Sequence, residues 1–384
     1  MKTLIFRTNG NVVNLKTYNL QEIGIAKALR DYNIECDIMY YGGNNSTREE
    51  YIRYRDNKIK IIWAKGYNFA GNGVFINIGK YLDQYDIIQV CEYDQLYSRY
   101  LAFFSRYKNK VCMTHGPYYN KTNIKYNIKI GIVDRLWVPE KQKKNTWFFA
   151  KSVYAKEFLE KRGFEKVVVT GVGLDIERFK DISKENEIIE KIKRFKGNDD
   201  LLLYIGQISE RRNILFIIEL MNELKKKIPN IKLVIVGNGE KKYKNSCFNR
   251  IEKLKLADDI YYAEGIEQNQ LSSLYKLASA FLLPTKYEIF GMVMLEAMYF
   301  GIPLITTDNG GAITVINNGE NGFILPLDSE KWVNTIYSII YDKEKARIIS
   351  IKERETIIRY YSWNNIVRKM LAEYDYILNN HSVK

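Results

Sequence analysis

Two glutamates in the second half of the chain, Glu288 and Glu296, are the residues whose type and spacing most clearly suggest chemistry. An apolar strand pattern ends at Pro284, a short loop carries Glu288, and a helical pattern runs from about Gly291 to Phe300. Backbone N–H groups at a helix start lack partners within the helix and lie at the positive end of its dipole, which favours a bound phosphate. Glu296 lies in the apolar helix and needs hydrogen-bond donors, which a ribose diol supplies. The alternative is a buried glutamate paired with a nearby Lys or Arg.

Two basic residues, Arg211 and Arg212, follow the apolar stretch Leu201–Ile205 and the turn at Gly206. In an open α/β sheet, ligands bind beyond the carboxyl ends of the strands. The planar fork of an arginine donates two hydrogen bonds at once, which suits a diphosphate. The alternative is an ordinary basic start of the next helix.

A second strand pattern, Leu233–Val236, ends in Gly237-Asn238-Gly239. Glycine lets a substrate approach the backbone closely, so these three residues and Gly206 are candidate contacts to a nucleotide. The alternative is a turn that only reverses the chain.

Short apolar stretches alternate with amphipathic ones along the whole chain, as in parallel sheets covered by helices. The stretches expected as strands are Leu4–Arg7, Cys36–Tyr41, Ile59–Trp63, Ile87–Val90, Val111–Thr114, Trp147–Ala150, Val167–Thr170, Leu201–Ile205, Leu233–Val236, Ile260–Ala263, Ala280–Leu283 and Leu304–Thr306. The clearest helical patterns are Leu20–Asp31, Ser152–Arg162, Asn213–Lys227 and Gln270–Ala278. So many strands exceed one open sheet, and we predict an α/β protein with two doubly wound domains.

The domain boundary is expected in the charged stretch before Leu201–Ile205. The predicted parts are an N-terminal domain at 1–178, a linker at 179–198, a second domain at 199–356 and closing helices at 357–384.

Further motifs accompany the two glutamates. They are Gly301-Ile302-Pro303-Leu304-Ile305, Asn309-Gly310-Gly311, Gly319-Glu320-Asn321-Gly322-Phe323, Thr114-His115-Gly116, Ser152–Gly163, Gly171-Val172-Gly173-Leu174-Asp175 and Tyr361-Ser362-Trp363. Together they resemble the retaining glycosyltransferases of family 4, and the likeness covers most of the chain. It implies the GT-B fold, in which two Rossmann-like domains face each other across a cleft and a C-terminal helix returns to the first domain.

The resemblance also implies roles on the donor side. Arg212 matches the basic residue that compensates the leaving diphosphate, and Glu296 matches the carboxylate on the nucleotide ribose. Glu288 matches a contact to the donor sugar. The matching backbone contacts come from Phe290, Gly291, Met292 and Val293.

On the side of the first domain, His115 matches a histidine that faces the reacting sugar. The alternative is a histidine that stabilises the turn before Gly116-Pro117. Two positions depart from the family. Gln207 stands where an arginine is usual, and Arg211 is the candidate replacement; the first βα loop, which normally has a glycine pair, has only Gly10.

The composition indicates the cellular compartment and the cofactors to expect. The four cysteines are far apart with no C-x-x-C pair, which is typical of reduced thiols in a cytoplasmic protein. No signal pattern opens the chain, and no apolar stretch reaches the length of a membrane span. No D-x-D-like element demands a metal, so we expect no cofactor and no metal, with cationic side chains in that role.

The net charge of +14 is concentrated between residues 101 and 150, where ten Lys or Arg face two Asp or Glu. Trp137, Trp147 and Phe148 lie in the same stretch. A basic surface with aromatics suits an anionic membrane, which would make the protein peripheral on the inner membrane face. The alternatives are a solvated basic face and nucleic acid, but no nucleic-acid-binding motif supports the latter, and we expect none.

The expected function is retaining transfer of a hexose-type sugar from a nucleotide-sugar donor, with UDP favoured, to a glycan or lipid-linked acceptor. The expected setting is cell-surface polysaccharide or glycolipid synthesis. The alternatives are a GDP-mannose-dependent mannosyltransferase, another GT-B enzyme such as a sugar-nucleotide epimerase, and a non-catalytic nucleotide-sugar-binding subunit.

Overall fold

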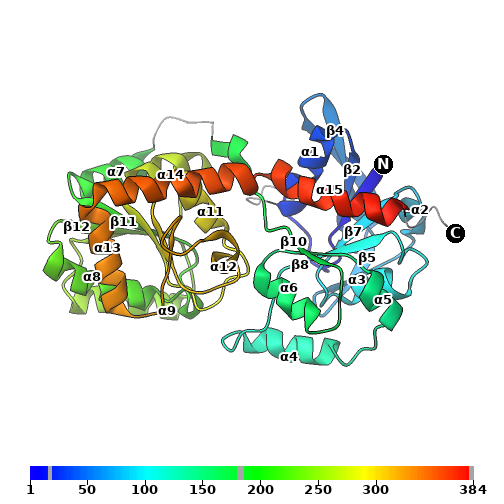
Figure 1. Cartoon of the computed structure of the whole chain (residues 1–384), viewed down its shortest axis with the longest axis horizontal. Coiled ribbons are helices and arrows are strands. Elements are labelled where there is room, and N and C mark those ends of the chain that lie inside the picture. The colour runs from blue at the N-terminus through cyan, green and yellow to red at the C-terminus, as the bar shows by residue number, and fades with distance from the viewer. Residues whose placement is uncertain (16–19, 180–185, 380–384) are drawn as a thin grey trace. The chain divides into compact units, whose positions relative to one another are not determined.

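The computed structural model describes residues 1–15, 20–179 and 186–379 of the chain. These residues form two compact units, and Figure 1 labels many of their elements. Unit 1 comprises Met1–Gly173 and Ser362–Lys384, and unit 2 comprises Leu174–Tyr361. The chain therefore leaves unit 1, builds unit 2 completely and returns.

Unit 1 is built on one twisted sheet with the strand order β10-β9-β8-β7-β1-β2-β4-β3. Its pairs are parallel except for β3 with β4. The strands are β1 (Lys2–Phe6), β2 (Glu35–Tyr41), β3 (Arg48–Tyr54), β4 (Asn57–Ala64), β7 (Ile87–Cys91), β8 (Val111–His115), β9 (Phe148–Ala150) and β10 (Val167–Val169), and a separate hairpin pairs β5 (Gly66–Phe69) with β6 (Asn72–Phe75). The central strands are buried, as expected for a parallel sheet covered on both faces.

The helices of unit 1 come from two separate parts of the chain, residues 21–160 and 363–379. They are α1 (Gln21–Asp31), α2 (Gly79–Leu82), α3 (Leu96–Arg99) with a π-helical turn at Tyr100–Phe104, α4 (Ile124–Val133), α5 (Glu140–Asn145), α6 (Val153–Glu160) and α15 (Trp363–Asn379). Helix α15 packs on α1 so closely that a Cβ at Gly24 would lie 2.2 Å from the indole of Trp363. Tyr374 of α15 also donates a hydrogen bond to Gln89 of β7. The expected return of a C-terminal helix to the first domain is therefore confirmed.

Unit 2 is built on a six-stranded sheet, parallel throughout, with the order β13-β12-β11-β14-β15-β16. Its strands are β11 (Asp200–Ile205), β12 (Ile231–Val236), β13 (Ile260–Ala263), β14 (Ala280–Leu283), β15 (Leu304–Thr306) and β16 (Phe323–Ile324). Its helices are α7 (Glu187–Lys196), α8 (Ile214–Lys227), α9 (Lys241–Lys253), α10 (Leu271–Leu277), α11 (Met292–Tyr299), α12 (Ala312–Val315), α13 (Ser329–Tyr341) and α14 (Lys343–Tyr360), with short 3-10 turns at Ile176–Phe179, Glu210–Arg212 and Gln268–Gln270. Two doubly wound α/β units were predicted, and that prediction is confirmed.

The stretch 179–198, expected as a linker, instead contains helix α7, and residues 180–185 of it lie outside the described residues. Ile189 and Ile192 of α7 are fully buried, because a strongly amphipathic helix covers part of the unit 2 core. The closing helices expected at 357–384 also divide. Helix α14 ends at Tyr360 in unit 2, and α15 belongs to unit 1.

Candidate functional site

The strand order of unit 2 reverses between β11 and β14, and the candidate donor residues follow these two strands. Strands β12 and β13 lie on one side of β11, and β15 and β16 lie beyond β14. In open α/β sheets the crevice for a ligand opens at such a reversal, at the carboxyl ends of the strands. Arg211 and Arg212 lie in the loop after β11, and Glu288 lies in the loop after β14.

Arg212 and Glu288 form an ion pair across this reversal, through Nη1 of the arginine and Oε2 of the glutamate. Both side chains are largely buried, at 14% and 12% exposed. Nη1 of Arg211 lies 3.9 Å from the same carboxylate oxygen and donates a hydrogen bond to the carbonyl oxygen of Tyr287 at 2.5 Å. Two guanidinium groups thus share one carboxylate. Sequence reasoning predicted each residue as a ligand contact but not that they contact one another.

Beside this ion pair, buried hydrogen-bonding groups remain without partners among the described residues. Burial and then the charge of Arg212 lower the pKa of Arg211, although Glu288 acts in the opposite direction. Nε of Arg212 and the hydroxyl of Ser209 are buried, and neither has a hydrogen-bond partner among the described residues. A buried donor without a partner costs free energy, which a bound ligand with acceptor oxygens would recover. Ser209 was missed by sequence reasoning; its position three residues before Arg212 in the same loop was the available signal.

The glycines beside this site have a packing role. The loop after β11 and the loop after β12 contact each other backbone to backbone, with a hydrogen bond of 2.9 Å from the N–H of Ile208 to the carbonyl oxygen of Asn238. A Cβ at Gly237 would lie 1.9 Å from the carbonyl oxygen of Gly206, and one at Gly239 would lie 1.8 Å from that of Ile208. These positions require glycine whether or not a ligand is bound. The contact of Gly206, Gly237, Asn238 and Gly239 with a nucleotide remains a prediction.

Helix α11 begins directly after the loop that carries Glu288. Gly291 is its N-terminal residue outside the helix and has a φ of 83°, a conformation that glycine adopts without strain. No side chain of the described residues forms a capping hydrogen bond at this end. Met292 and Val293 of the first turn are half-buried and Phe290 is buried. The amino end of α11 thus has the features of an anion-binding helix start, as the sequence indicated.

A neighbouring loop holds this segment in place. The N–H of Gly310 donates to the carbonyl oxygen of Glu288 at 3.1 Å. Asn309, which is 1% exposed, donates to Thr307 at 2.7 Å and accepts from the N–H of Ala312 at 3.1 Å. A Cβ at Gly311 would lie 1.6 Å from the carbonyl oxygen of Phe290. The Asn309-Gly310-Gly311 motif therefore fixes the approach of the chain to α11.

Glu296 lies on the buried side of α11 and is 1% exposed. Its Oε2 accepts a hydrogen bond of 2.7 Å from the hydroxyl of Tyr275. A tyrosine thus satisfies part of this carboxylate, where sequence reasoning weighed a ribose against a Lys or Arg partner. The role of Glu296 toward a ribose remains a prediction.

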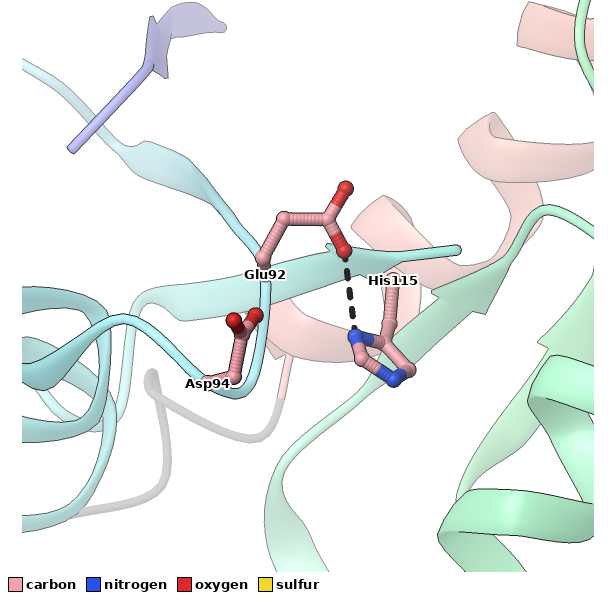
Figure 2. A group of neighbouring side chains, drawn as sticks. All are labelled: Glu92, Asp94 and His115. Atoms are coloured by element: carbon pink, nitrogen blue, oxygen red, sulfur yellow. Dashed lines mark ion pairs between the residues drawn. The ribbon is translucent and has the colours of Figure 1, made fainter. Parts of the chain in front are cut away.

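In unit 1, His115 lies at the end of β8 beside the loop after β7, as Figure 2 shows. Its Nδ1 is 3.1 Å from Oε2 of Glu92, and Lys151 lies 2.7 Å from the other oxygen of that carboxylate. Burial raises the pKa of Glu92, but Lys151 and His115 outweigh it, and the pKa is lowered overall. The N–H of Gly116 also donates to Glu92 at 2.9 Å.

This arrangement fits both explanations of the histidine. His115 is fully buried, with its ring 5.1 Å from that of Phe158. Its partner Glu92 also accepts from the N–H of Gly116, so the histidine is linked to this turn, as expected for a structural role. However, Nε2 has no hydrogen-bond partner among the described residues, which leaves it for a ligand. Contact with a sugar would require the covering side chains to move.

Glu92, Asp94 and His115 each place one possible metal-binding atom within 4.8 Å of the others (Figure 2). The donor set does not fit a divalent cation, because each carboxylate already binds an ammonium group. Lys151 pairs with Glu92, and Lys129 pairs with Asp94. A metal would have to displace both lysines.

The sheet of unit 1 reverses between β1 and β7, and a cavity of about 340 Å³ opens there. Its lining includes Arg7, Thr8, Asn9, Glu22, Glu92 and Lys151. Gly10, in the first βα loop, is not among the lining residues; its N–H donates to Gly71 at 3.0 Å and its carbonyl oxygen accepts from Asn68 at 2.8 Å. The β5–β6 hairpin therefore holds this loop.

Residues 185–356 match the family model described as Glycosyl transferases group 1. The sulfoquinovosyl transferase of Arabidopsis thaliana is 26% identical over 205 residues, which cover 52% of this chain and 38% of that protein. The lipopolysaccharide 1,2-N-acetylglucosaminetransferase of Salmonella typhimurium is 27% identical over 242 residues, covering 60% and 62%. The chain spans about half the length of such relatives.

Solved structures match over both units. Sucrose-phosphate synthase from Thermosynechococcus elongatus has a TM-score of 0.73 at 16% identity, covering 99% of this chain and 100% of that one. Anabaena HepE in complex with UDP and glucose has a TM-score of 0.69 at 16% identity, covering 97% and 99%. The fold is GT-B. Within it, residues 185–356 match the glycosyl transferases group 1 model, so the predicted resemblance to this superfamily is confirmed, while the retaining mechanism remains a prediction.

Each helix of the described residues is too short or too polar to cross a membrane.

Proposed function

We propose that this chain is a retaining glycosyltransferase that transfers a hexose-type sugar from UDP-sugar to a glycan or lipid-linked acceptor. The observation that carries the proposal is the convergence of Arg211, Arg212 and Glu288 at the strand-order reversal of unit 2, beside the amino end of α11. Two cations and a helix start suit a diphosphate, and a carboxylate suits sugar hydroxyls. The relatives named for sugar transfer support the class of reaction.

In this proposal the leaving nucleoside diphosphate gains negative charge as its bond to the sugar breaks. Arg212, Arg211 and the first turn of α11 stabilise that charge, which is the main catalytic contribution of the protein. Donor binding divides the ion pair: the guanidinium of Arg212 turns to phosphate, and Glu288 accepts sugar hydroxyls. Glu296, whose Oε2 accepts from Tyr275 in the structure, binds the ribose hydroxyls through its carboxylate. The leaving phosphate accepts the acceptor's proton on the same face of the sugar, which retains the anomeric configuration.

The choice of UDP is supported by the Anabaena structure that holds UDP and glucose. It is tested by melting the protein with UDP, GDP and ADP, because a ligand that binds the folded state stabilises it by about 2.7 kcal/mol at a hundredfold excess over Kd. We expect UDP to give the largest rise in Tm and Arg212→Ala to abolish it. A larger rise with GDP would instead favour the mannosyltransferase alternative.

Metal independence is also proposed, because the cationic side chains would supply the charge stabilisation that Mg²⁺ supplies in other transferases. We expect full transfer activity in excess EDTA. Loss of activity that Mg²⁺ restores would contradict this part of the proposal alone. The anomeric proton of the first-formed product, observed by NMR, tests retention directly.

A further inference from the structure

An apolar stripe lies on the exposed side of helix α4 in unit 1. Ile124, Ile128 and Ile132 are 64%, 62% and 60% exposed, and their spacing of four residues places them on one face of the helix. The opposite side of α4 contributes Ile130 and Val133, which are 2% and 5% exposed, to the core of the unit. The helix is therefore apolar on two sides, and only one of them is covered.

The stripe continues past the end of the helix. Leu136 and Trp137 are 46% and 71% exposed, and the Trp137 ring lies 6.0 Å from that of Phe104, which is itself 47% exposed. We name Ile124, Ile128, Ile132, Leu136 and Trp137 the α4 face. Gly131 lies within it, and a Cβ built there has nothing within 4 Å. No other described part of the chain therefore covers the middle of this face.

The charges around the α4 face are of one sign. Residues 119–144 contain two acids, and both are already paired, Asp134 with Arg162 and Glu140 with Lys143. Five exposed cations of the same segment have no described ion pair: Lys121, Lys125, Arg135, Lys141 and Lys144. A partner that covers the apolar face must therefore also accept positive charge.

We infer that the α4 face docks on the surface of a bilayer that contains anionic lipids, with its isoleucines and Trp137 in the interface and the surrounding lysines at the headgroups. An interfacial helix combines an apolar face, flanking Lys or Arg, and an aromatic side chain at the headgroup level. The inference goes beyond sugar transfer, since docking requires neither donor nor acceptor.

Two other occupants fit the observations less well. A second copy of the chain, paired through the same face, would bring the five cations against themselves, which like-charge repulsion opposes. Nucleic acid would satisfy the cations but would leave the three isoleucines against a charged phosphate backbone. A single surface that offers both acyl chains and anions is that of an anionic membrane.

The test is sedimentation of the full chain with vesicles of phosphatidylcholine, alone or with about 30 mol% phosphatidylglycerol, at about 50 and 500 mM NaCl. We expect binding to the anionic vesicles at low salt. Ile128→Ser with Ile132→Ser should weaken it about tenfold or more through lost apolar burial. Lys121→Gln with Lys125→Gln should weaken it by at least about tenfold, and only at low salt.

The matched control is Ile348→Ser with Ile351→Ser on α14, two isoleucines that are 42% and 45% exposed on unit 2. This variant should bind vesicles like the unchanged protein. Trp137 supplies an independent measurement, because its fluorescence should shift to shorter wavelength on docking, and Trp137→Phe should remove that shift. Circular dichroism and UDP binding should remain unchanged in every variant, which separates this inference from the proposed donor site.

Equal binding to neutral and anionic vesicles, or equal binding by the α4 and α14 variants, would overturn the inference. Self-association that the α4 variants abolish, without any vesicle binding, would assign the face to a second copy instead. Binding to DNA that the lysine variant weakens and the isoleucine variant leaves unchanged would assign the cations to nucleic acid.

Discussion

Two residues of the candidate donor site have a structural and a proposed functional role at once. Arg212 and Glu288 form an ion pair in the structure, and the same two side chains are proposed to bind the donor. Arg212 and Glu288 are largely buried, so each charge depends on the other in the absence of ligand. Removal of one partner therefore changes stability as well as catalysis, and a single substitution cannot separate the two effects.

A double substitution separates them. We expect Arg212→Ala to lower turnover at least about 10²-fold, as the loss of one preorganised electrostatic contact does. It should also lower the free energy of unfolding by about 2 kcal/mol, because the buried carboxylate of Glu288 loses its nearest cation and Arg211 lies farther away, at 3.9 Å. Adding Glu288→Gln should restore much of that stability but none of the turnover. Urea unfolding and initial rates of sugar transfer measure the two quantities.

The control for this pair is Arg347→Ala on α14, whose partner Glu344 forms an exposed ion pair. It should change neither quantity measurably. If the double variant regained turnover together with stability, the role of Arg212 and Glu288 would be structural, and the proposed donor site would be misplaced.

At the scale of elements, the sequence predicted those strands that are buried on both faces. Leu201–Ile205 and Leu233–Val236 are continuous apolar stretches, which only a covered parallel strand accommodates. Strand β3 was not predicted, because Arg48–Tyr54 lies at the sheet edge and is polar on its exposed positions. The β5–β6 hairpin and the two-residue β16 are too short to give a periodic signal.

The ion pairs Glu92–Lys151 and Arg212–Glu288 could not be predicted from the sequence, for a related reason. Glu92 and Lys151 are 59 residues apart, and Arg212 and Glu288 are 76 apart. Only the order of the strands in each sheet brings them together, and neither spacing nor periodicity determines that order. The residue types at the strand ends could be predicted, but their partners could not.

Helix α14 is connected to the sheet of unit 2 by a buried acid. Glu353 is fully buried, and its Oε1 accepts a hydrogen bond of 2.8 Å from the N–H of Leu304 in β15. Burial raises the pKa of Glu353 well above its usual value, although that hydrogen bond lowers it. The folded protein thus keeps a proton that the unfolded chain loses above its ordinary pKa.

The folded state is therefore favoured at low pH, and this contribution is lost as the pH rises from the unfolded toward the folded pKa of Glu353. We expect unit 2 of Glu353→Gln to gain stability relative to the unchanged protein between pH 5 and 8, by at most about 1.4 kcal/mol per pH unit. A loss of stability from the amide substitution that is the same at every pH does not change this pH dependence of the stability difference. Urea unfolding at several pH values measures it, with the exposed Glu355→Gln as control. A pH-independent difference would contradict the assignment of a proton to Glu353.

At the scale of the whole molecule, the chain builds unit 1 from two distant segments and unit 2 from one. The second segment of unit 1 is essentially α15, whose buried side chains are Trp363, Ile366, Val367, Met370, Tyr374 and Ile377. Trp363 packs against α1 where Gly24 permits the approach, and Tyr374 contacts β7. The last helix therefore completes the core of the unit that contains the first strand.

This discontinuity predicts an asymmetric effect of truncation. Each large apolar side chain contributes about 1.5–3 kcal/mol when buried, so six of them contribute on the order of 10 kcal/mol, comparable to the whole stability of a domain. Removal of Ser362–Lys384 should therefore unfold unit 1, while unit 2, whose sheet and donor residues all lie within Leu174–Tyr361, stays folded and is still stabilised by UDP. Hydrogen exchange of β1 and β11 distinguishes the units, and removal of residues 380–384 alone is the control. Protection of β1 in the truncated chain would show that unit 1 folds without α15, and loss of protection in both strands would show that the two units fold as one.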